Sequence, residues 1–436
     1  MTQLRHAIGI LHETKNRWER RVPLIPEEVA ALVRDGIEVR VERSPSRAFR
    51  DEEFAAAGAT LVDDATDCRL LMGVKEVKKH QVRPGATVMC FSHTIKGQSH
   101  NMPLLKHFIE QGASLVDYEV IVDDKGQRTV AFGRYAGLAG AHETLWTLAH
   151  RMKALGHDSP LTALKHAVEY ADLADMASYT RAALDELRRS GPDALAPLVV
   201  GVTGNGRVSR GSLEYLELVG AIPCTLDECI ALPVEAPGDR TLRVLHLTDE
   251  MIYEWAGQHR RFSFEHYLAH PQLYISRCAM YLPFMKALIN GLYWDERFPR
   301  ILDDATARRM LAQETLPPVI GDVACDIRGG VEWTVMATEN DAPAFVYDPA
   351  TGSAPVGVEG PGVAIMSVDN LPTALPRDAS VDFSRALSPY VRAFFEADLR
   401  GGVGALSPAN QNAVVVAGGR LTPRHQGLAR FLEGHS

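Results

Sequence analysis

Two ionisable residues follow short apolar runs that have the character of buried strands. Lys75 ends the run LMGVK, and His93 follows the next such run, ATVMCFS. An unpaired charge is costly to bury, so a lysine and a histidine at these positions need a reason. Histidine titrates near neutral pH, and burial or cationic neighbours lower the pKa of a lysine. The pair could therefore transfer protons, although a snorkelling surface lysine and a satisfied core histidine are the alternatives.

A second cluster, GVTGNGRVSRG, has the residues of a phosphate-binding turn. Gly204 and Gly206 directly follow an apolar strand pattern and precede a helical one, which Arg207 and Val208 open. Glycines in this context let the backbone approach a pyrophosphate at a helix N-terminus. The full G-x-G-x-x-G is not met, because Ser209 stands at the third glycine position. The cluster favours a dinucleotide site, and a tight turn needed only for packing is the alternative.

An acidic residue about 20 positions beyond such a turn holds a ribose hydroxyl in NAD sites. Asp227, in CTLDEC, is the candidate for this role, and a surface acid is an equally plausible interpretation. The choice between NAD and NADP therefore stays open on this residue.

Composition indicates a folded globular protein with small-molecule partners. Hydrophobic residues make up 46% and charged residues 23% of the sequence. The length of 436 residues predicts two domains. The net charge of −9, without a long basic block, argues against nucleic-acid and membrane surfaces. Six scattered cysteines predict reduced thiols and no metal site. The start of the sequence has too short an apolar core for a secretory signal, and we expect a cytoplasmic protein.

Strand and helix patterns alternate along the first third of the chain. HAIGILHE and IEVRVER are typical of strands, IPEEVAALVRDG and DEEFAAAGA of helices, and the same rhythm continues through ASLVDYEVIVD. This βαβ order predicts a mostly parallel sheet. The Ala-rich AGLAGAHETLWTLAHRMKALG predicts a long helix that joins two domains, with a boundary near residue 134.

These residues lie within longer blocks that resemble one enzyme family. The blocks follow, in order, those of the lysine–2-oxoglutarate reductase domain of the bifunctional lysine-degrading enzymes. They are HETKNRWERRVPLIP, GVKEV, FSHTIKGQ, DYEVIVDDKGQRTVAFGRYAGLAG, YISRCAMYLPFMKALINGLYWDERFPRIL, GDVACDIRGGVEW and SVDNLPTALPRDAS. The chain is also similar to the fungal lysine-forming saccharopine dehydrogenase and, more distantly, to alanine dehydrogenase and the transhydrogenase nucleotide-binding subunit. The resemblance covers nearly the whole chain and implies a single activity.

The resemblance implies an α/β fold of two Rossmann-like domains, with mostly parallel sheets and an interdomain cleft. The N-terminal domain is expected to be discontinuous: residues 1–134 with 328–436 form the substrate domain, and residues 135–327 form the dinucleotide-binding domain. The implied reaction condenses the ε-amine of lysine with 2-oxoglutarate and reduces the imine to saccharopine. NADPH is the expected cofactor, with NADH as the second candidate. The sequence leaves open whether the protein is a monomer or a dimer.

Two other functions stay open. One is an alanine-dehydrogenase-like or opine-forming imine reductase that acts on another amine and keto acid. The other is a catalytically silent nucleotide-binding protein, which the incomplete glycine pattern allows.

The resemblance also assigns roles to particular residues. The family's catalytic lysine and histidine fall on Lys75 and His93, and Glu76 is a neighbour able to tune the lysine. Arg21 and Arg128 match substrate-binding arginines, whose planar guanidinium groups can grip a carboxylate in bidentate fashion. Surface salt bridges are the alternative for both arginines.

Three acidic residues complete the expected sites. Glu119, in VDYEV, matches a family acid near the substrate amine. Asp322 and Asp326, in GDVACDIRGG, follow an apolar strand pattern, and one of them corresponds to a family aspartate near the cofactor. Helix or turn capping is the alternative for each aspartate.

Overall fold

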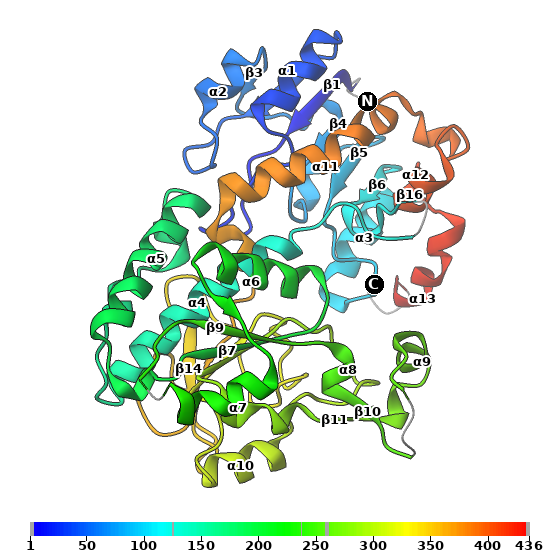
Figure 1. Cartoon of the computed structure of the whole chain (residues 1–436). Coiled ribbons are helices and arrows are strands. Elements are labelled where there is room, and N and C mark those ends of the chain that lie inside the picture. The colour runs from blue at the N-terminus through cyan, green and yellow to red at the C-terminus, as the bar shows by residue number, and fades with distance from the viewer. Residues whose placement is uncertain (1–3, 124–125, 237, 258–260, 433–436) are drawn as a thin grey trace. The chain divides into compact units, whose positions relative to one another are not determined.

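The computed structural model describes residues 4–123, 126–236, 238–257 and 261–432 (Figure 1). It divides into two compact units. Unit 1 consists of Met1–Phe132 and Pro376–Ser436, and unit 2 consists of Gly133–Leu375. The sequence placed the return of the chain to the first domain near residue 328. The return lies at Pro376 instead, because two strands after residue 328 are hydrogen-bonded into the sheet of unit 2.

Unit 1 is built on an eight-stranded sheet with the order β17-β16-β6-β5-β4-β1-β2-β3. The six strands from β6 to β3 are parallel, and β16 and β17 run antiparallel at one edge. The bounds are β1 (Arg5–Ile10), β2 (Val39–Glu42), β3 (Thr60–Val62), β4 (Cys68–Met72), β5 (Thr87–Cys90), β6 (Ser114–Asp117), β16 (Val414–Ala417) and β17 (Arg420–Leu421). The predicted parallel sheet is therefore confirmed, and the two antiparallel strands are an addition.

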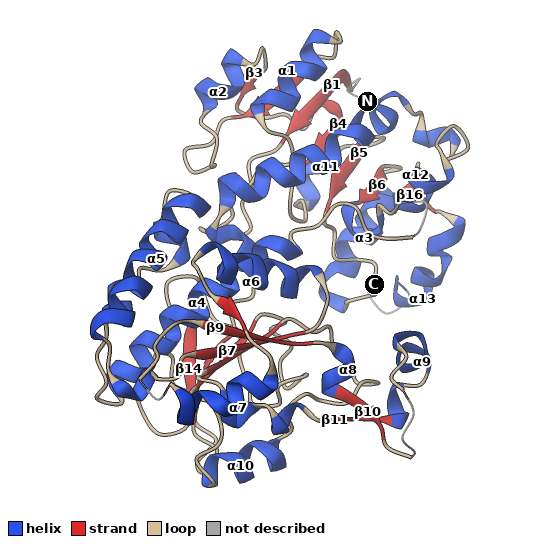
Figure 2. Cartoon of the chain, viewed as in Figure 1, coloured by secondary structure: helices blue, strands red, loops and turns tan. Residues whose placement is uncertain are grey.

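Helices cover both faces of this sheet (Figure 2). One core contains side chains of α1 (Pro26–Arg34), α2 (Asp51–Ala56) and α11 (Pro376–Glu396), together with one face of the strands. The other core contains side chains of α3 (Met102–Glu110) and α13 (Ala429–Leu432), and α12 (Pro408–Ala413) leads into β16. Both faces are thus buried, which is the usual arrangement of a parallel sheet and explains the apolar character of its strands.

Unit 2 contains a seven-stranded sheet with the order β14-β15-β13-β12-β7-β9-β8, parallel except for β14. The bounds are β7 (Val199–Thr203), β8 (Ile222–Pro223), β9 (Arg243–Leu247), β12 (Ala287–Asn290), β13 (Val319–Asp322), β14 (Ala344–Tyr347) and β15 (Val363–Met366). A separate ribbon pairs β10 (Tyr253–Trp255) with β11 (Tyr274–Ser276). The strand β9 lies between β8 and β7 although it follows β8 in the chain, an order that affects the nucleotide site.

The helices of unit 2 also lie on both faces of their sheet. On one face α4 (Gly133–Ala154) and α6 (Arg207–Leu218) contact the central strands, with α5 (Leu173–Ser190) outside them. The core of the other face contains side chains of α7 (Leu226–Glu235), α8 (Asp249–Ile252), α9 (Phe264–Ala269) and α10 (Asp304–Ala312). Among the described helices, none combines the length and the apolar character that a membrane span needs.

The helices α4 and α6 pack closely through two glycines. A Cβ added at Gly137 would lie 2.0 Å from the backbone oxygen of Val208, and one at Gly211 would lie 2.1 Å from that of Arg134. No side chain fits at either position without a backbone shift. The third glycine of a dinucleotide-binding turn allows the helix to pack closely on a strand, whereas Gly211, two residues later, allows α6 to pack closely on α4.

Candidate active site

Four neighbouring parallel strands of unit 1 bring polar side chains to one edge of the sheet. Lys75 and His93 each come three residues after the ends of the adjacent strands β4 and β5. Glu13 follows β1, and Glu119 follows β6, on either side of this pair. Because the carboxyl ends of parallel strands meet at one edge, these residues form the candidate active site of unit 1.

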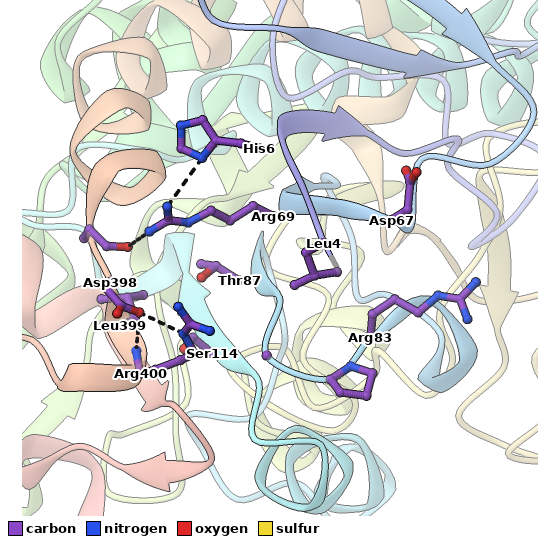
Figure 3. A pocket seen from close by; sticks show the side chains of 13 residues that line it. Leu4, His6, Asp67, Arg69, Arg83, Thr87, Ser114, Asp398, Leu399 and Arg400 are labelled. Atoms are coloured by element: carbon purple, nitrogen blue, oxygen red, sulfur yellow. Dashed lines mark hydrogen bonds and ion pairs between the residues drawn. The ribbon is translucent and has the colours of Figure 1, made fainter. Parts of the chain in front are cut away.

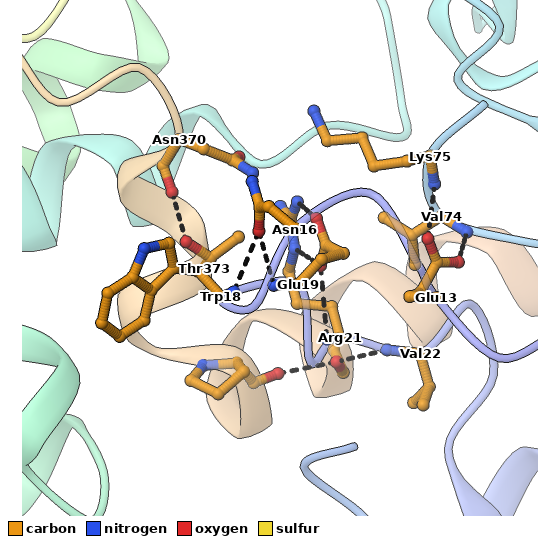
Figure 4. A network of polar contacts seen from close by, with 12 residues as sticks. Glu13, Asn16, Trp18, Glu19, Arg21, Val22, Val74, Lys75, Asn370 and Thr373 are labelled. Carbon is orange, nitrogen blue, oxygen red and sulfur yellow. Dashed lines mark hydrogen bonds and ion pairs between the residues drawn. The ribbon is translucent and has the colours of Figure 1, made fainter. Parts of the chain in front are cut away.

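Glu13 lies against the backbone of the Lys75 loop (Figure 4). Its Oε1 accepts a hydrogen bond from the amide of Val74 at 2.5 Å, and its Oε2 accepts one from the amide of Lys75 at 3.2 Å. Burial, and then the nearby charge of Glu19, raise the pKa of Glu13 to about 8. Glu13 was not among the residues predicted from the sequence, although its place just after a buried strand is the same signal that marked Lys75 and His93.

Glu76 joins the two strand ends by pairing with His93. The Nδ1 of His93 lies 3.1 Å from Oε2 of Glu76, and the ammonium of Lys15 pairs with Oε1. Burial acts to raise the pKa of Glu76, but the hydrogen bonds with His93 and Lys15 outweigh it and hold that pKa at about 2. Glu76 is therefore ionised, so Nδ1 of His93 must be the donor and Nε2 is the nitrogen left to exchange protons. Glu76 thus contacts His93 and Lys15, whereas the sequence expected it to act on Lys75.

The backbone of His93 has an unusual conformation that its neighbours hold in place. Its φ of +52° lies in the left-handed region, which non-glycine residues adopt at a cost. Asn101 donates from Nδ2 to the carbonyl of His93 at 3.2 Å. Asp117 accepts hydrogen bonds from the amide of Ser92 at 3.1 Å and from the amide of Glu119 at 2.8 Å. Asp117 thus ties together the loops that carry His93 and Glu119.

Arg21 is held by a carboxylate of the protein itself. Its Nε donates to Oε1 of Glu19 at 2.7 Å and its Nη2 donates to Oε2 at 2.5 Å. Both residues are only 2% exposed, and the guanidinium lies 4.1 Å from the ring centre of Phe132. The pairing with Arg21 lowers the pKa of Glu19, against the effect of burial. The bidentate grip expected of Arg21 is therefore already used by Glu19.

Arg128 and Glu119 lie near each other at the same edge. The Nη1 of Arg128 is 4.0 Å from Oε1 of Glu119, and its Nε donates to the carbonyl of Val130 at 3.0 Å. The guanidinium sits 5.1 Å from the ring centre of Phe91. With 38% of its side chain exposed, Arg128 is far more accessible than Arg21.

The predicted glycine turn of unit 2 joins β7 to α6. Gly204 has a φ of +87°, and a Cβ there would come 2.7 Å from the side chain of Leu292. Gly206 is the N-cap of α6, and a Cβ there would meet nothing within 4 Å. Ser209, in place of the third glycine, is buried and donates from Oγ to the carbonyl of Thr203 at 2.7 Å. The turn therefore keeps its shape with an altered glycine pattern, and open space lies in front of Gly206.

The acid nearest to this turn is Asp249, not Asp227. Asp249 follows β9, the strand beside β7, and accepts a hydrogen bond from Nδ2 of Asn205 in the turn at 2.6 Å. Burial raises the pKa of Asp249. Asp227 is exposed, in the first turn of α7 beyond the edge strand β8. The spacing rule assumes that the strand after the turn helix lies beside β7, and here β9 takes that place.

Asp322 and Asp326 differ in their surroundings. Asp322, the last residue of β13, accepts hydrogen bonds from Nδ2 of Asn290 at 2.8 Å and from Oγ1 of Thr334 at 2.5 Å. It is 1% exposed, and burial raises its pKa to about 6. Asp326 lies in the turn after this strand and is only half-buried. Asp322 thus braces neighbouring strands, whereas Asp326 is the more accessible acid.

Known domain families and solved structures resemble this chain in fold. Residues 9–139 match the family model "Alanine dehydrogenase/PNT, N-terminal domain". A solved L-alanine dehydrogenase matches 99% of this chain and 100% of its own at a TM-score of 0.63 and 18% identity. A transhydrogenase from Sinorhizobium meliloti matches 95% of this chain and 100% of its own at a TM-score of 0.58 and 16% identity. These likenesses confirm the predicted fold class.

Comparison with curated proteins points to particular relatives. The chain is 34% identical to an alpha-aminoadipic semialdehyde synthase of Arabidopsis thaliana, over 88% of this chain and 38% of that protein. It is 32% identical to the mitochondrial enzyme of that name from Rattus norvegicus, over 98% of this chain and 48% of that protein. It is 28% identical to the saccharopine dehydrogenase [NAD(+), L-lysine-forming] of Neurospora crassa, over 88% of this chain and 90% of that protein. The chain spans less than half the length of the first two relatives, and the resemblance predicted from the sequence blocks is confirmed.

Proposed function

We propose that this protein interconverts L-lysine plus 2-oxoglutarate with saccharopine, as a nicotinamide-dependent oxidoreductase acting on a CH–NH bond. The observation that carries the proposal is the cluster of titratable groups at one edge of the unit 1 sheet, in a chain similar to the relatives named above. Its partners are small molecules. A cytoplasmic location is part of the proposal, in keeping with its six free cysteines.

Forming an imine from an amine and a ketone moves protons in two steps. The lysine ammonium loses a proton before its nitrogen attacks the ketone, and the resulting hydroxyl gains one before it leaves as water. We assign these transfers to Lys75 and His93. Glu76 fixes the histidine tautomer, so Nε2 of His93 accepts or donates the proton. Glu13, with a pKa of about 8, is a further group that can exchange a proton near neutral pH.

The carboxylates of the substrates need cations at the same edge. Arg128 is the proposed carboxylate-binding residue, because its guanidinium is part-exposed and lies beside Glu119, the acid proposed to meet the substrate amine. Arg21 contributes charge to this edge from within its buried pair with Glu19. A bidentate arginine contact would orient the keto acid as well as hold it.

The glycine turn of unit 2 is the proposed site of the cofactor, which supplies hydride when bound. Gly204 gives the turn its left-handed conformation, and Gly206 leaves the amino end of α6 open to a pyrophosphate. Arg207 and Val208 form the first residues of that helix. Of the two aspartates near β13, Asp326 is the one proposed to meet the cofactor, since Asp322 is enclosed by its own hydrogen bonds.

We propose NADH as the preferred cofactor, in place of the NADPH that the sequence blocks favoured. The position of Asp249 supports NADH. Its carboxylate lies just after β9, the strand beside β7, and accepts a hydrogen bond from Asn205 in the turn. A carboxylate at this place accepts a hydrogen bond from a ribose 2′-hydroxyl and repels a 2′-phosphate.

A coupled-substrate assay tests the proposed function. Oxidation of NADH or NADPH by the purified protein, followed by the nicotinamide absorbance, should require both lysine and 2-oxoglutarate. Pyruvate with ammonia, or another amine, replacing this pair at higher kcat/KM would favour an alanine-dehydrogenase-like or opine-forming reductase. Binding of nucleotide without turnover in either direction would favour a silent nucleotide-binding protein.

A further inference from the structure

A large cavity lies at the opposite edge of the unit 1 sheet, where the parallel strands begin (Figure 3). Its volume is about 900 Å³, and its lining comes from the amino ends of β1, β4, β5 and β6 and from the short helix η11 (Leu399–Gly401). We call it the amino-edge pocket. It shares no lining residue with the candidate active site. At about 3.3 Å per residue, a five-residue strand separates the two edges by about 15 Å.

Most charges in the amino-edge pocket are already paired. The lining carries three arginines and two aspartates. Asp398 pairs with Arg400 at 3.0 Å, and Asp67 pairs with Arg5, just outside the pocket, at 3.3 Å. Arg83 has an aspartate partner of its own outside the pocket at 3.6 Å. The lining therefore holds one cation more than it holds acids.

Arg69 is that remaining cation. Its Nη2 donates to the carbonyl of Ala397 at 2.8 Å, and its Nη1 donates to Nδ1 of His6 at 3.4 Å. Among the residues that the structure describes, no carboxylate lies within ion-pair distance of its guanidinium. A half-buried arginine without a carboxylate partner, at the wall of a cavity, is suited to bind an anion from solution.

Thr87 provides a second polar group in the lining of the pocket. It begins β5, where its partner in β4 is Leu70, the residue after Arg69, and it lines the pocket while only 6% of its surface is exposed. Its hydroxyl makes no hydrogen bond within the described part of the chain, and Figure 3 shows it among the side chains around the cavity. The hydroxyl is open to the cavity and can donate a hydrogen bond to a bound molecule.

We propose that the amino-edge pocket binds a small organic anion, whose carboxylate contacts the remaining N–H groups of Arg69 and accepts a hydrogen bond from Thr87. The size of the pocket fits an organic molecule better than a bare inorganic ion. Apolar lining from Leu4, Pro84 and Leu399 suits the carbon skeleton of such a molecule. The pocket is separate from the proposed reaction, and its existence does not depend on it.

Isothermal titration of the full chain tests the proposal, with citrate as the organic polycarboxylate and inorganic phosphate in parallel. Wild-type protein should bind citrate more tightly than phosphate. Arg69→Gln should weaken citrate binding at least about tenfold and Thr87→Val about threefold, since the first removes a charged contact and the second a neutral one. Arg43→Gln, which alters an exposed arginine of the same unit outside the pocket, should leave the affinity unchanged.

Citrate can also bind to the cations of the candidate active site, so the titration is repeated with Arg128→Gln. This variant should still show the citrate binding that Arg69→Gln removes. Thermal unfolding shows whether each variant is folded, and Thr87→Val carries the test if Arg69→Gln is not. Citrate binding that is absent in the wild type, or unchanged in the Arg69 and Thr87 variants, would overturn the proposal. Equal affinity for phosphate and citrate would overturn the assignment to an organic anion.

Discussion

His93 donates a hydrogen bond from Nδ1 to the Glu76 carboxylate at 3.1 Å, between the loops that follow two adjacent parallel strands. The pKa of Glu76 is held at about 2, so the acceptor is an ionised carboxylate at any pH near neutral. This contact fixes one tautomer of the imidazole and offsets the charge that His93 gains when it takes up a proton. The left-handed backbone of His93 adds a second constraint on where the ring points.

Replacing Glu76 with Gln should therefore lower kcat by about tenfold without changing the KM for the nucleotide, because glutamine keeps the shape but can neither hold the tautomer nor balance the imidazolium. Steady-state kinetics measure both values. Lys15→Met, which removes the exposed partner of the other Glu76 oxygen, is the matched control and should change kcat by less than about twofold. A normal kcat in Glu76→Gln would show that the contact has no part in the chemistry.

Glu13 should make the stability of the protein depend on pH. Its pKa rises from 4.5 to about 8 on folding, so its contribution is complete below pH 4.5 and is lost as the pH increases toward 8. This shift can change the free energy of unfolding by at most about 5 kcal/mol between low and high pH. Urea unfolding near pH 5 and near pH 8 should show a larger decrease in unfolding free energy for wild type than for Glu13→Gln. Equal decreases in the two proteins would contradict the raised pKa.

Alanine substitutions at two glycines near the turn of unit 2 should distinguish a role in helix packing from a role in nucleotide binding. Gly211→Ala should lower the unfolding free energy by at least about 2 kcal/mol, because its Cβ would meet the backbone of Arg134. Gly206→Ala should change it by less than about 0.5 kcal/mol, since φ is −74° and the space is open. The same Gly206 variant should raise the KM for the nucleotide by limiting its approach. If Gly206→Ala lost stability but bound nucleotide normally, Gly206 would have a role in packing and not in nucleotide binding.

Asp249 and Asp227 should differ in their effect on cofactor choice. Asp249→Ser removes the carboxylate beside the turn and should increase the ratio of kcat/KM for NADPH over NADH by about tenfold or more. Asp227→Ser, the matched control in the first turn of α7, should leave that ratio unchanged. The opposite pattern would restore Asp227 as the discriminating acid, and a wild-type preference for NADPH would contradict the argument from Asp249.

Local patterns in the sequence predicted much of the fold. Pro26 begins α1, and Gly36, with a φ of +81°, follows the end of that helix, as the sequence indicated. The boundary near residue 134 and the glycine turn also lie where the patterns placed them. The predicted return of the chain to unit 1 near residue 328 was wrong. The short strand β15 pairs with β13, and β14 pairs with β15, so both belong to the sheet of unit 2. Such long-range pairing leaves no local signal.

The positions of polar residues at the ends of strands were predictable from the sequence, whereas their contacts and pKa values were not. Lys75 and His93 are residues of this kind. The sequence does not show that Glu19 and Arg21, two residues apart, are buried as a pair. Nor does it show the raised pKa of Glu13, which follows from burial and from the nearby charge of Glu19. The contact of Asp249 with the glycine turn could not be predicted, because strand order in the sheet of unit 2 departs from order in the chain.

The most direct test of the account follows the transferred hydride into the product. Lysine and 2-oxoglutarate are incubated with nicotinamide cofactor deuterated at its reactive carbon, and the product is analysed by mass spectrometry. Wild-type protein should form saccharopine that carries deuterium at the carbon derived from the ketone. Lys75→Met and His93→Gln should form it 10²–10⁴-fold more slowly, while nucleotide affinity stays nearly intact. Absence of labelled saccharopine from the wild type, or near-normal rates in both variants, would contradict the account.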